Sequence, residues 1–321
     1  MRLIVVALTV LALVAGLSLA VGAQDIAPRE VVTALVHDDG SQDAAIVREL
    51  RLPRTLVGLA VGVSLGLAGA LMQALTRNPL ADPGLLGIHA GAAAAIVVAI
   101  GALGLSSPAV YVWFAFAGAA AASVIVYVLG GATPVRLALA GTAVAAALTA
   151  LTSSITLVDP QAFDEFRFWT VGALAGRDFG VLAEVGPFLL VGALLALALA
   201  RPLNALALGD DAGRALGAGV GRTRALGAVA ITLLCGGATA LAGPIGFVGL
   251  TVPHAARAIA GPDQRRVLAY SVVLAPILLL GADVVGRVVL RPAELEVGIV
   301  TALIGAPVFI ALVRRTRIAQ L

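Results

Sequence analysis

The sequence is dominated by uncharged apolar blocks, each about as long as a lipid bilayer is thick. The first five are Leu3–Val21, Thr55–Leu75, Leu85–Leu105, Ala109–Leu129 and Leu137–Leu157. A helix needs about 20 apolar residues to cross the hydrocarbon core. Because lipid cannot satisfy backbone polar groups, blocks of this length predict helices. We therefore expect an all-α integral membrane protein and not a β-barrel, whose strands would appear as short alternating segments.

The composition excludes several other classes of protein. The chain is 60% hydrophobic and only 12% charged, whereas about one-quarter of the residues of a soluble domain are charged. The net charge of +3 is small, and no run of Arg is interleaved with aromatic residues, so we expect no nucleic-acid partner. Cys235 is the single cysteine, which excludes an intrachain disulfide and a thiolate metal cluster.

The N-terminal block has two interpretations. Met1-Arg2 followed by Leu3–Val21 and small residues could be a secretory signal peptide with a cleavage site. The block is long for a signal peptide and has the length of a membrane span. The interpretation we favour is an uncleaved first helix, and the membrane assignment holds in either case.

Five further blocks bring the number of candidate spans to about ten. They are Leu182–Ala200, Ala225–Leu241, Pro244–Ile259, Val267–Val285 and Val297–Val313. The weakest assignment is the pair within 225–259, because 35 residues are few for two full crossings. A single long crossing or a re-entrant segment is the alternative there.

The distribution of arginine predicts the orientation. With the N-terminus inside and the spans alternating, the inner segments hold 13 Arg and four acidic residues, and the outer side holds 8 Arg and 14 acidic residues. Basic residues concentrate in cytoplasmic loops, so both termini are expected in the cytoplasm. Two crossings within 225–259 are favoured because they place Arg222 and Arg224 on the same side as Arg265 and Arg266.

Three polar stretches and one glycine pattern complete the layout. Gln24–Arg54 falls outside, and so does Asp159–Asp178, whose aromatic and charged residues suit an amphipathic helix at the interface. Arg201–Arg224 is the longest cytoplasmic loop. Gly58, Gly62 and Gly66 are spaced by four, which places them on one helix face and admits a close neighbouring helix.

Several kinds of chemistry are absent from the sequence. All 21 basic residues are Arg, so no phosphate-binding loop with its lysine can occur. His37, His89 and His254 are scattered and predict no metal site. No H-E-x-x-H motif is present, and the one G-x-S-x-G match, Gly62-Val-Ser-Leu-Gly66, lies inside an apolar block, so we do not expect an enzyme.

Charge within the predicted spans is scarce. Asp283 is the clearest case, and Arg287 follows four residues later on the same helical face, where the two side chains can pair. An ion-coupled transporter normally requires intramembrane carboxylates, so their scarcity argues against that class.

Ordered motifs along nearly the whole chain carry a specific resemblance. They are Arg51-Leu-Pro-Arg-Thr-Leu-Val-Gly58, Leu67-Ala-Gly-Ala-Leu-Met-Gln73, Arg77-Asn-Pro-Leu-Ala-Asp-Pro-Gly-Leu-Leu-Gly87, Leu139-Ala-Gly141, Phe168-Trp-Thr-Val-Gly172, Leu206-Ala-Leu-Gly209, Ala215-Leu-Gly217, Gly243-Pro-Ile-Gly-Phe-Val-Gly-Leu-Thr-Val-Pro-His254 and Gly305-Ala-Pro-Val-Phe309. This pattern resembles the iron-siderophore and cobalamin permease family, the FecCD-type transmembrane subunits of bacterial ABC importers.

The resemblance implies an architecture and a set of partners. It implies a type II ABC importer permease fold of ten helices, with residues 1–321 forming one transmembrane domain in the bacterial cytoplasmic membrane. Such a permease pairs with a second permease subunit, two cytoplasmic ATPase subunits and an extracytoplasmic substrate-binding protein. ATP and Mg²⁺ would be bound by the ATPase chains, and this chain would carry no cofactor or metal of its own. The implied cargo is an iron(III)-siderophore or a related metal chelate, with cobalamin and haem left open.

The resemblance also implies roles for three groups of residues. Arg51, Arg54 and Arg287 match outward-facing arginines that dock the binding protein through its acidic residues. The loop that seats in the ATPase cleft and couples it to the helices matches Gly209, Asp210, Asp211, Arg214, Ala215, Leu216 and Gly217. The turn of the inner gate matches Asn78, Pro79 and Leu80.

The implied mechanism is alternating access, in which ATP binding on the partner chains moves the Arg201–Arg224 loop and opens the pore to one side at a time. We expect the pore to be lined by small and apolar residues, because a large chelate then meets nothing that grips it. The alternatives from other classes are a stand-alone ion-coupled secondary transporter and, less favoured, a membrane enzyme.

Overall fold

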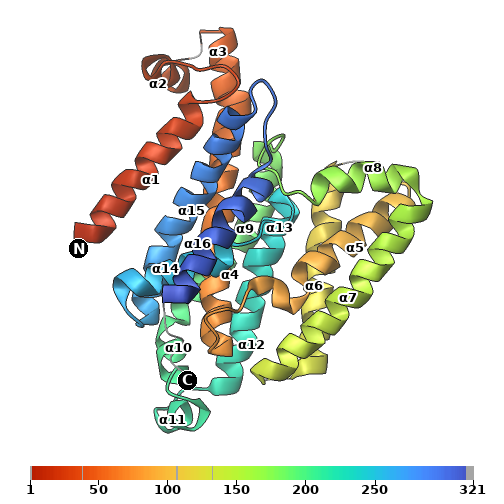
Figure 1. The fold of residues 1–321 in the computed structure, drawn as a ribbon, viewed down its shortest axis with the longest axis vertical. Helices are drawn as coiled ribbons and strands as arrows, with labels where there is room; N and C mark the ends of the chain where they lie inside the picture. Colours follow the sequence, from red (N-terminus) through yellow and green to blue (C-terminus); the bar gives the residue numbers. More distant parts are fainter. Residues whose placement is uncertain (1, 38, 106–107, 132, 316–321) are drawn as a thin grey trace.

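The computed structural model describes residues 2–37, 39–105, 108–131 and 133–315. These residues form helices joined by short connections, and no strand occurs among them (Figure 1). Seven helical runs in the described ranges are long and apolar enough to cross a membrane. They are α1 (Arg2–Ala20), the run of α3 (Gln42–Ala45) into α4 (Leu52–Thr76), α6 (Pro108–Gly130), α7 (Pro134–Val158), α9 (Phe179–Ala198), the run of α12 (Val220–Ile231) into α13 (Gly237–Ala242), and α15 (Gln264–Val289).

Three shorter helices lie among these seven. They are α5 (Ile88–Gly101), α14 (Val248–Ala260) and α16 (Val297–Arg315). α5 and the Val297–Ala311 part of α16 are apolar but below full spanning length. The expectation of an all-α membrane protein is confirmed, while the count of ten spans holds only if these three shorter helices are included.

The predicted third span is longer than the helix found there. The sequence predicted Leu85–Leu105, but α5 begins at Ile88 and ends at Gly101. Before it, the Asp82 carboxylate accepts a hydrogen bond from Gly84 N at 2.8 Å and caps a 3₁₀ turn, Pro83–Leu86. Gly87 then adopts φ +71°, a conformation that glycine reaches without strain. Local capping of this kind competes with helical hydrogen bonds, so the helix begins later in the sequence.

The weakly assigned region 225–259 contains two antiparallel arms of unequal length. The first arm runs through α12 and α13 with a π-helical turn, Thr232–Gly236, between them. Gly243, at φ +74°, and Pro244 end it, and the second arm, α14, has only 13 residues. The connection that precedes α9 contacts this break, since Ala173 N donates a hydrogen bond to Ala242 O at 2.7 Å. The chain therefore reverses as expected, but α14 is shorter than a full span.

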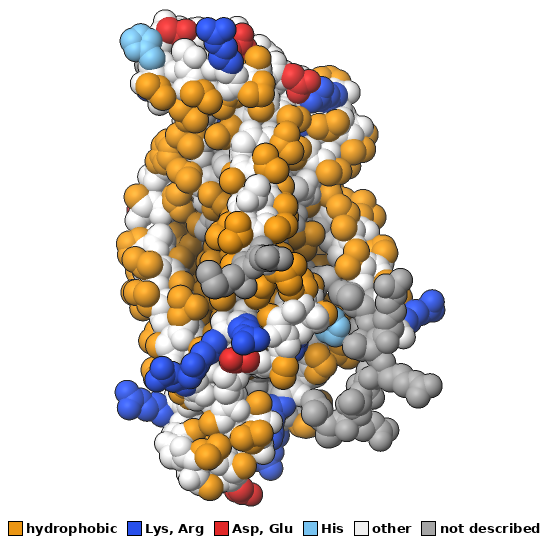
Figure 2. Space-filling model, turned by 90° about the vertical axis from the view of Figure 1, so that its left-hand side faces the viewer, with side chains coloured by type: hydrophobic (Ala, Val, Ile, Leu, Met, Phe, Trp, Pro, Cys, Tyr) orange, Lys and Arg blue, Asp and Glu red, His pale blue; other side chains and the backbone are white. Residues whose placement is uncertain are grey.

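Short helices gather at the two ends of the molecule (Figure 1). At one end lie α2 (Pro28–Val36), α3 and α8 (Pro160–Trp169), and at the other lie α10 (Ala200–Leu206) and α11 (Asp210–Ala215). α8 is the helix expected within Asp159–Asp178, and it exposes Phe163 and Phe168. Figure 2 shows a broad hydrophobic surface between the charged ends on the face that carries α1. This distribution is that of a protein embedded in lipid between two aqueous faces.

α4 lies at the centre of the packing. Of its most apolar stretch 78% is buried, against 11% for α7 and 6% for α1. Its glycine face meets α15 as the spacing predicted. A Cβ at Gly62 would lie 2.7 Å from Pro276 Cα, and a Cβ at Gly66 would lie 2.6 Å from Ala275 Cβ. Contact between small residues lets two helices approach closely in a membrane, where dispersion contacts drive association.

Replacing Gly62 by Ala should separate α4 from α15. The added methyl group would collide with the backbone of Pro276, which cannot rotate away, and overpacking of this kind costs about 1–3 kcal/mol. The gain in helix propensity, about 1 kcal/mol, does not offset the upper part of that range. We expect a lower thermal unfolding midpoint for Gly62→Ala in detergent.

The matched control is Gly281→Ala in α15, where no atom lies within 4 Å of the added Cβ. It should unfold at the wild-type temperature or slightly above it. Equal midpoints for the two variants would contradict the close contact between α4 and α15.

Candidate functional site

A buried carboxylate binds two arginines at the end of the molecule that carries α2 and α3, which the arginine distribution predicts to be the outer end. The Asp283 side chain is fully buried, and its Oδ1 lies 2.7 Å from Arg54 Nη2. Arg287 donates to Oδ2 of the same carboxylate through Nε at 3.0 Å, and its Nη2 also contacts Oδ2. The predicted pairing of Asp283 with Arg287 is confirmed, and Arg54 is a second partner from another helix. The carboxylate therefore joins α15 to the start of α4.

The same arginines hold the end of α1. Arg287 Nη1 donates to Ser18 O at 2.8 Å and to Val21 O at 3.0 Å, and its Nη2 donates to the Ser18 hydroxyl at 2.8 Å. Arg51 Nη1 donates to Leu19 O at 2.8 Å and to Ala20 O at 2.7 Å. The last carbonyls of a helix have no partners within it, so these guanidinium groups satisfy the C-terminal end of α1.

The three arginines expected to dock a binding protein line one pocket. It has a volume of about 270 Å³, and Glu294 lies on its wall with Arg51, Arg54 and Arg287. The expectation that the arginines face outward differs from the structure, since Arg51 is only 6% exposed and Arg287 2%. Both side chains point inward because they donate hydrogen bonds to acceptors of their own chain. The pocket holds three guanidinium groups, and the carboxylates of Asp283 and Glu294 neutralise two of them. One positive charge therefore remains.

Further charged groups surround the pocket in the outer connections. Arg291 donates to Asp25 at 2.7 Å and 3.0 Å and holds the pKa of that carboxyl below its usual value. Burial raises the pKa of Glu296, and burial lowers the pKa of Arg177. The cost of removing a charge from water causes both of these shifts. The outer rim is therefore more highly charged than the apolar helices below it.

The predicted inner-gate turn is an exposed, hydrogen-bonded loop at the opposite end of α4. Leu80 N donates to Asn78 Oδ1 at 2.9 Å, which closes a tight turn around Pro79. The Leu80 side chain is 42% exposed. The gate role of this turn stays a prediction from the family resemblance.

Side-chain hydrogen bonds fix the last turns of α4 to α14 just above this loop. Gln73 Nε2 donates to Leu250 O at 3.0 Å, and Arg257 Nη2 donates to Gln73 Oε1 at 2.7 Å. The inner-gate turn therefore extends from a fixed helix end.

The predicted coupling loop projects from the same end as the short helix α11 (Figure 1). It begins at Gly209, whose φ of 103° and ψ of 163° only glycine adopts readily. Arg214 pairs with Asp211 at 2.8 Å, and both side chains are exposed. Leu208 and Leu216 flank the helix, each 66% exposed. Exposed leucines beside charged groups form a surface that suits a protein partner.

The structure brings the coupling loop and the inner-gate turn together, which the sequence did not predict. Asp210 lies 3.6 Å from Arg77, the residue before the turn, and 3.0 Å from Arg224 on α12. Arg77 and Arg224 were counted as cytoplasmic arginines but not as site residues. In the sequence, only their charge indicated that they could form ion pairs. Four acidic residues on the side predicted to be cytoplasmic were equally possible partners.

Within the described ranges, no group of three or more His, Cys, Asp or Glu side chains is placed to hold a metal ion. His89 instead contacts the Thr239 hydroxyl at 3.0 Å, between α5 and α13. The only cysteine, Cys235, is buried in the π-helical turn.

The chain is similar to known proteins over nearly its full length. The model of the FecCD transport family matches residues 8–315. The ferric enterobactin transport system permease protein FepD of Escherichia coli (strain K12) is 50% identical over 313 residues, which cover 96% of this chain and 93% of that protein. The Fe(3+)-citrate import system permease protein YfmD of Bacillus subtilis (strain 168) is 42% identical over 320 residues, covering 99% and 96%.

A solved structure has the same fold. It is a chain of an ABC transporter assigned to the metal-chelate type, in an inward-facing conformation. The TM-score is 0.89 at 26% identity, and the match covers 98% of this chain and 99% of that chain. The helices described above, with their unequal lengths, are thus those of an ABC transporter permease.

Replacing Asp283 by Asn should strongly destabilise the outer end. The change leaves Arg54 and Arg287 in a buried site without their shared counter-ion, and breaking a buried ion pair in this way costs about 3–5 kcal/mol. We expect a large fall in the thermal unfolding midpoint and in the yield of folded protein.

Glu294→Gln is the matched control, because the Glu294 side chain is 31% exposed and contacts Arg54 alone among these arginines. It should lower the midpoint far less. If both variants were equally stable, Asp283 would not be the residue that holds α1, α4 and α15 together.

Proposed function

The chain belongs to the FecCD transport family, and from that membership we propose that it is the membrane-spanning permease subunit of an ATP-driven importer of iron(III)-siderophores. The family's members are transport permeases and not enzymes. Two relatives that match almost end to end are named for ferric enterobactin and ferric citrate. Both cargos are iron chelates, which favours a ferric chelate over cobalamin or haem.

The state of Asp283 argues against an ion-coupled secondary transporter. Such a transporter needs an intramembrane carboxylate that can gain and lose a cation as the protein cycles. Asp283 is fully buried and bound by two arginines at once. A carboxylate that is neutralised by fixed guanidinium groups is a structural element and cannot carry an ion.

The observation that carries the proposal is the uncovered face of α7. Thr142, Ala146, Thr149 and Ser153 lie on one side of this helix and are all exposed. The stripe is small, hydroxyl-rich and uncharged, so it does not form a tight binding site. It matches the weakly interacting wall expected of a pore for a large polar chelate. A second permease subunit facing α7 would enclose the pathway between the two chains.

The two ends of the molecule suit different partners. At the outer end, the positively charged pocket of Arg51, Arg54 and Arg287 suits an acidic side chain of a substrate-binding protein, inserted far enough to reach the inward-turned guanidinium groups. At the inner end, the loop from Gly209 to Gly217 suits the cleft of an ATPase subunit. ATP and Mg²⁺ would then act only on those partner chains.

The arginine distribution supports an orientation with both termini in the cytoplasm. In that orientation α2, α3 and α8 lie outside, and α10 and α11 lie inside. Nucleotide-driven movement of α11 would open the pore to one side at a time, while the binding protein delivers the chelate from the other side.

Uptake of radiolabelled ferric siderophores tests the function directly. Cells that lack this chain should lose uptake of at least one ferric siderophore, and the intact chain should restore it. Arg214→Ala should restore it about tenfold less well, because coupling free energies between sites correspond to about 5–150-fold effects. The exposed Arg214–Asp211 pair contributes little to folding, so the variant should reach the membrane normally.

Arg265→Gln, an exposed arginine at the start of α15, is the matched control and should restore full uptake. Loss of cobalamin or haem uptake alone would overturn the cargo. Unchanged uptake of all three kinds of cargo would overturn the importer assignment.

A bulky residue on the α7 stripe should block the pathway. Ser153→Phe fills space that the chelate must cross, and a steric barrier of about 1.4 kcal/mol slows passage about tenfold. Leu194→Phe on α9 is the control, because Leu194 is 58% exposed on a face with no hydroxyl stripe. Transport rates should fall for the first variant only, at equal membrane abundance. Equal rates for both variants would remove α7 from the pathway.

A further inference from the structure

A single carboxylate oxygen joins three cytoplasmic elements. Asp210, the first residue of α11, places Oδ1 3.0 Å from Arg224 Nη2 on α12. The same oxygen lies 3.6 Å from Arg77 Nη2, at the C-terminal cap of α4. α11, α12 and the end of α4 therefore meet at one charge, directly before the turn Asn78–Leu80.

The backbone at Arg77 is unusual for a residue that carries a side chain. Arg77 has φ 51° and ψ 33°, the left-handed conformation that ends many helices. Glycine usually occupies that position, because a Cβ is unfavourable there. Arg77 and Phe247 are the only non-glycine residues with positive φ in the described part of the chain. The Arg77 guanidinium packs over Gly209, whose Cβ would lie 3.7 Å from Nη1, and it reaches Asp210 next to that glycine.

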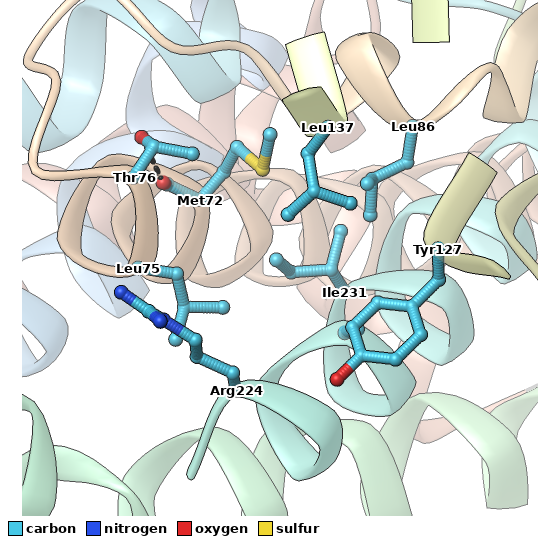
Figure 3. A pocket seen from close by; sticks show the side chains of 9 residues that line it. Met72, Leu75, Thr76, Leu86, Tyr127, Leu137, Arg224 and Ile231 are labelled. Atoms are coloured by element: carbon cyan, nitrogen blue, oxygen red, sulfur yellow. Dashed lines mark hydrogen bonds between the residues drawn. The ribbon is translucent and has the colours of Figure 1, made fainter. Parts of the chain in front are cut away.

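Arg224 fixes the other side of Asp210. Its side chain is 9% exposed, and it lines a small apolar cavity of about 20 Å³ with Leu75 and Thr76 of the last turn of α4. Figure 3 shows Arg224 beside Leu75, with Ile231 of the same helical run nearby. The buried Nε of Arg224 has no partner among the described residues. Because so buried a cation depends strongly on its counter-ion, the Arg224–Asp210 contact is a stable anchor.

The neighbouring acid on α11 behaves differently. Among the described residues, Asp211 pairs only with Arg214 of the same short helix, and its side chain is fully exposed. That pair does not connect α11 to another element. The two consecutive carboxylates therefore differ in position: Asp211 faces outward from the protein and Asp210 faces inward.

We propose that Asp210 is the positioning residue that transmits movement of the coupling helix to the inner gate. When α11 moves, Asp210 carries with it Arg77 and the attached turn Asn78–Leu80, while Arg224 keeps the carboxylate aligned. This inference rests on the proposed function, because it assumes that α11 is moved by an ATPase partner. It adds a specific ionic connection between two sites that are far apart in the sequence.

The test measures ferric siderophore uptake and ATP hydrolysis together, in liposomes that hold the complete transporter with its binding protein. Asp210→Asn should lower the uptake per ATP hydrolysed about tenfold, whatever its rate of ATP hydrolysis. Arg77→Gln should act in the same direction. Asp210→Glu, which keeps the charge, should restore most of the coupling. A merely structural role would lower the amount of folded complex and leave the ratio of uptake to hydrolysis unchanged.

A double-mutant cycle decides whether the two residues act as a unit. The variant carrying both Asp210→Asn and Arg77→Gln should be no worse than either single variant, because one connection is broken in all three. Arg265→Gln is the matched control and should keep the wild-type ratio. Multiplying effects in the double variant, or wild-type ratios in the single variants, would overturn the connection. Failure of the wild-type complex to take up any ferric siderophore would instead overturn the proposed function.

Discussion

The buried carboxylate of Asp283 is the interaction on which the outer half of the protein depends. One acidic group binds Arg54 at the start of α4 and Arg287 near the end of α15, and Arg287 in turn satisfies the C-terminal carbonyls of α1. In a membrane, unsatisfied polar groups are costly and helices gain little from hydrophobic burial against one another. The charge network and the glycine face of α4 together supply the specificity that apolar surface alone cannot provide.

The two ends of α4 are built in different ways. At the outer end, α4 is locked by a network that is almost fully buried. At the inner end, the helix stops at a strained Arg77 and leads into an exposed turn held by Asp210, whose side chain is 28% exposed. Exposed ion pairs are weak and rearrange readily. A firm outer end and an adjustable inner end suit the proposed transporter, which partner ATPase subunits would drive from the cytoplasmic side.

Irregular backbone interrupts the helices at three places. The 3₁₀ turn before α5, the break at Gly243–Phe247 and the π-helical turn Thr232–Gly236 all interrupt helices that composition alone would make continuous. Such interruptions are tolerated at membrane depth only when other protein groups bury and satisfy them. The contact of Ala173 N with Ala242 O supplies one such partner. The stripe of α7 is not covered by any of the residues that the structure describes and suits a second subunit.

The sequence by itself determined the class of the protein, because block length, charge scarcity and arginine asymmetry act locally and need no partner. It also predicted the Asp283–Arg287 pair and the glycine face of α4, since both follow from the four-residue spacing of a helix. The lengths of α5 and α14 required the structure, because capping by Asp82 and the break at Gly243 compete with hydropathy. The ion contacts were decided only by the tertiary structure. Arg54 and Asp283 are 229 residues apart, and no spacing rule reaches that far. Likewise, four acidic residues on the side predicted to be cytoplasmic could have paired with Arg77, and only the packing of α11 against α12 selects Asp210.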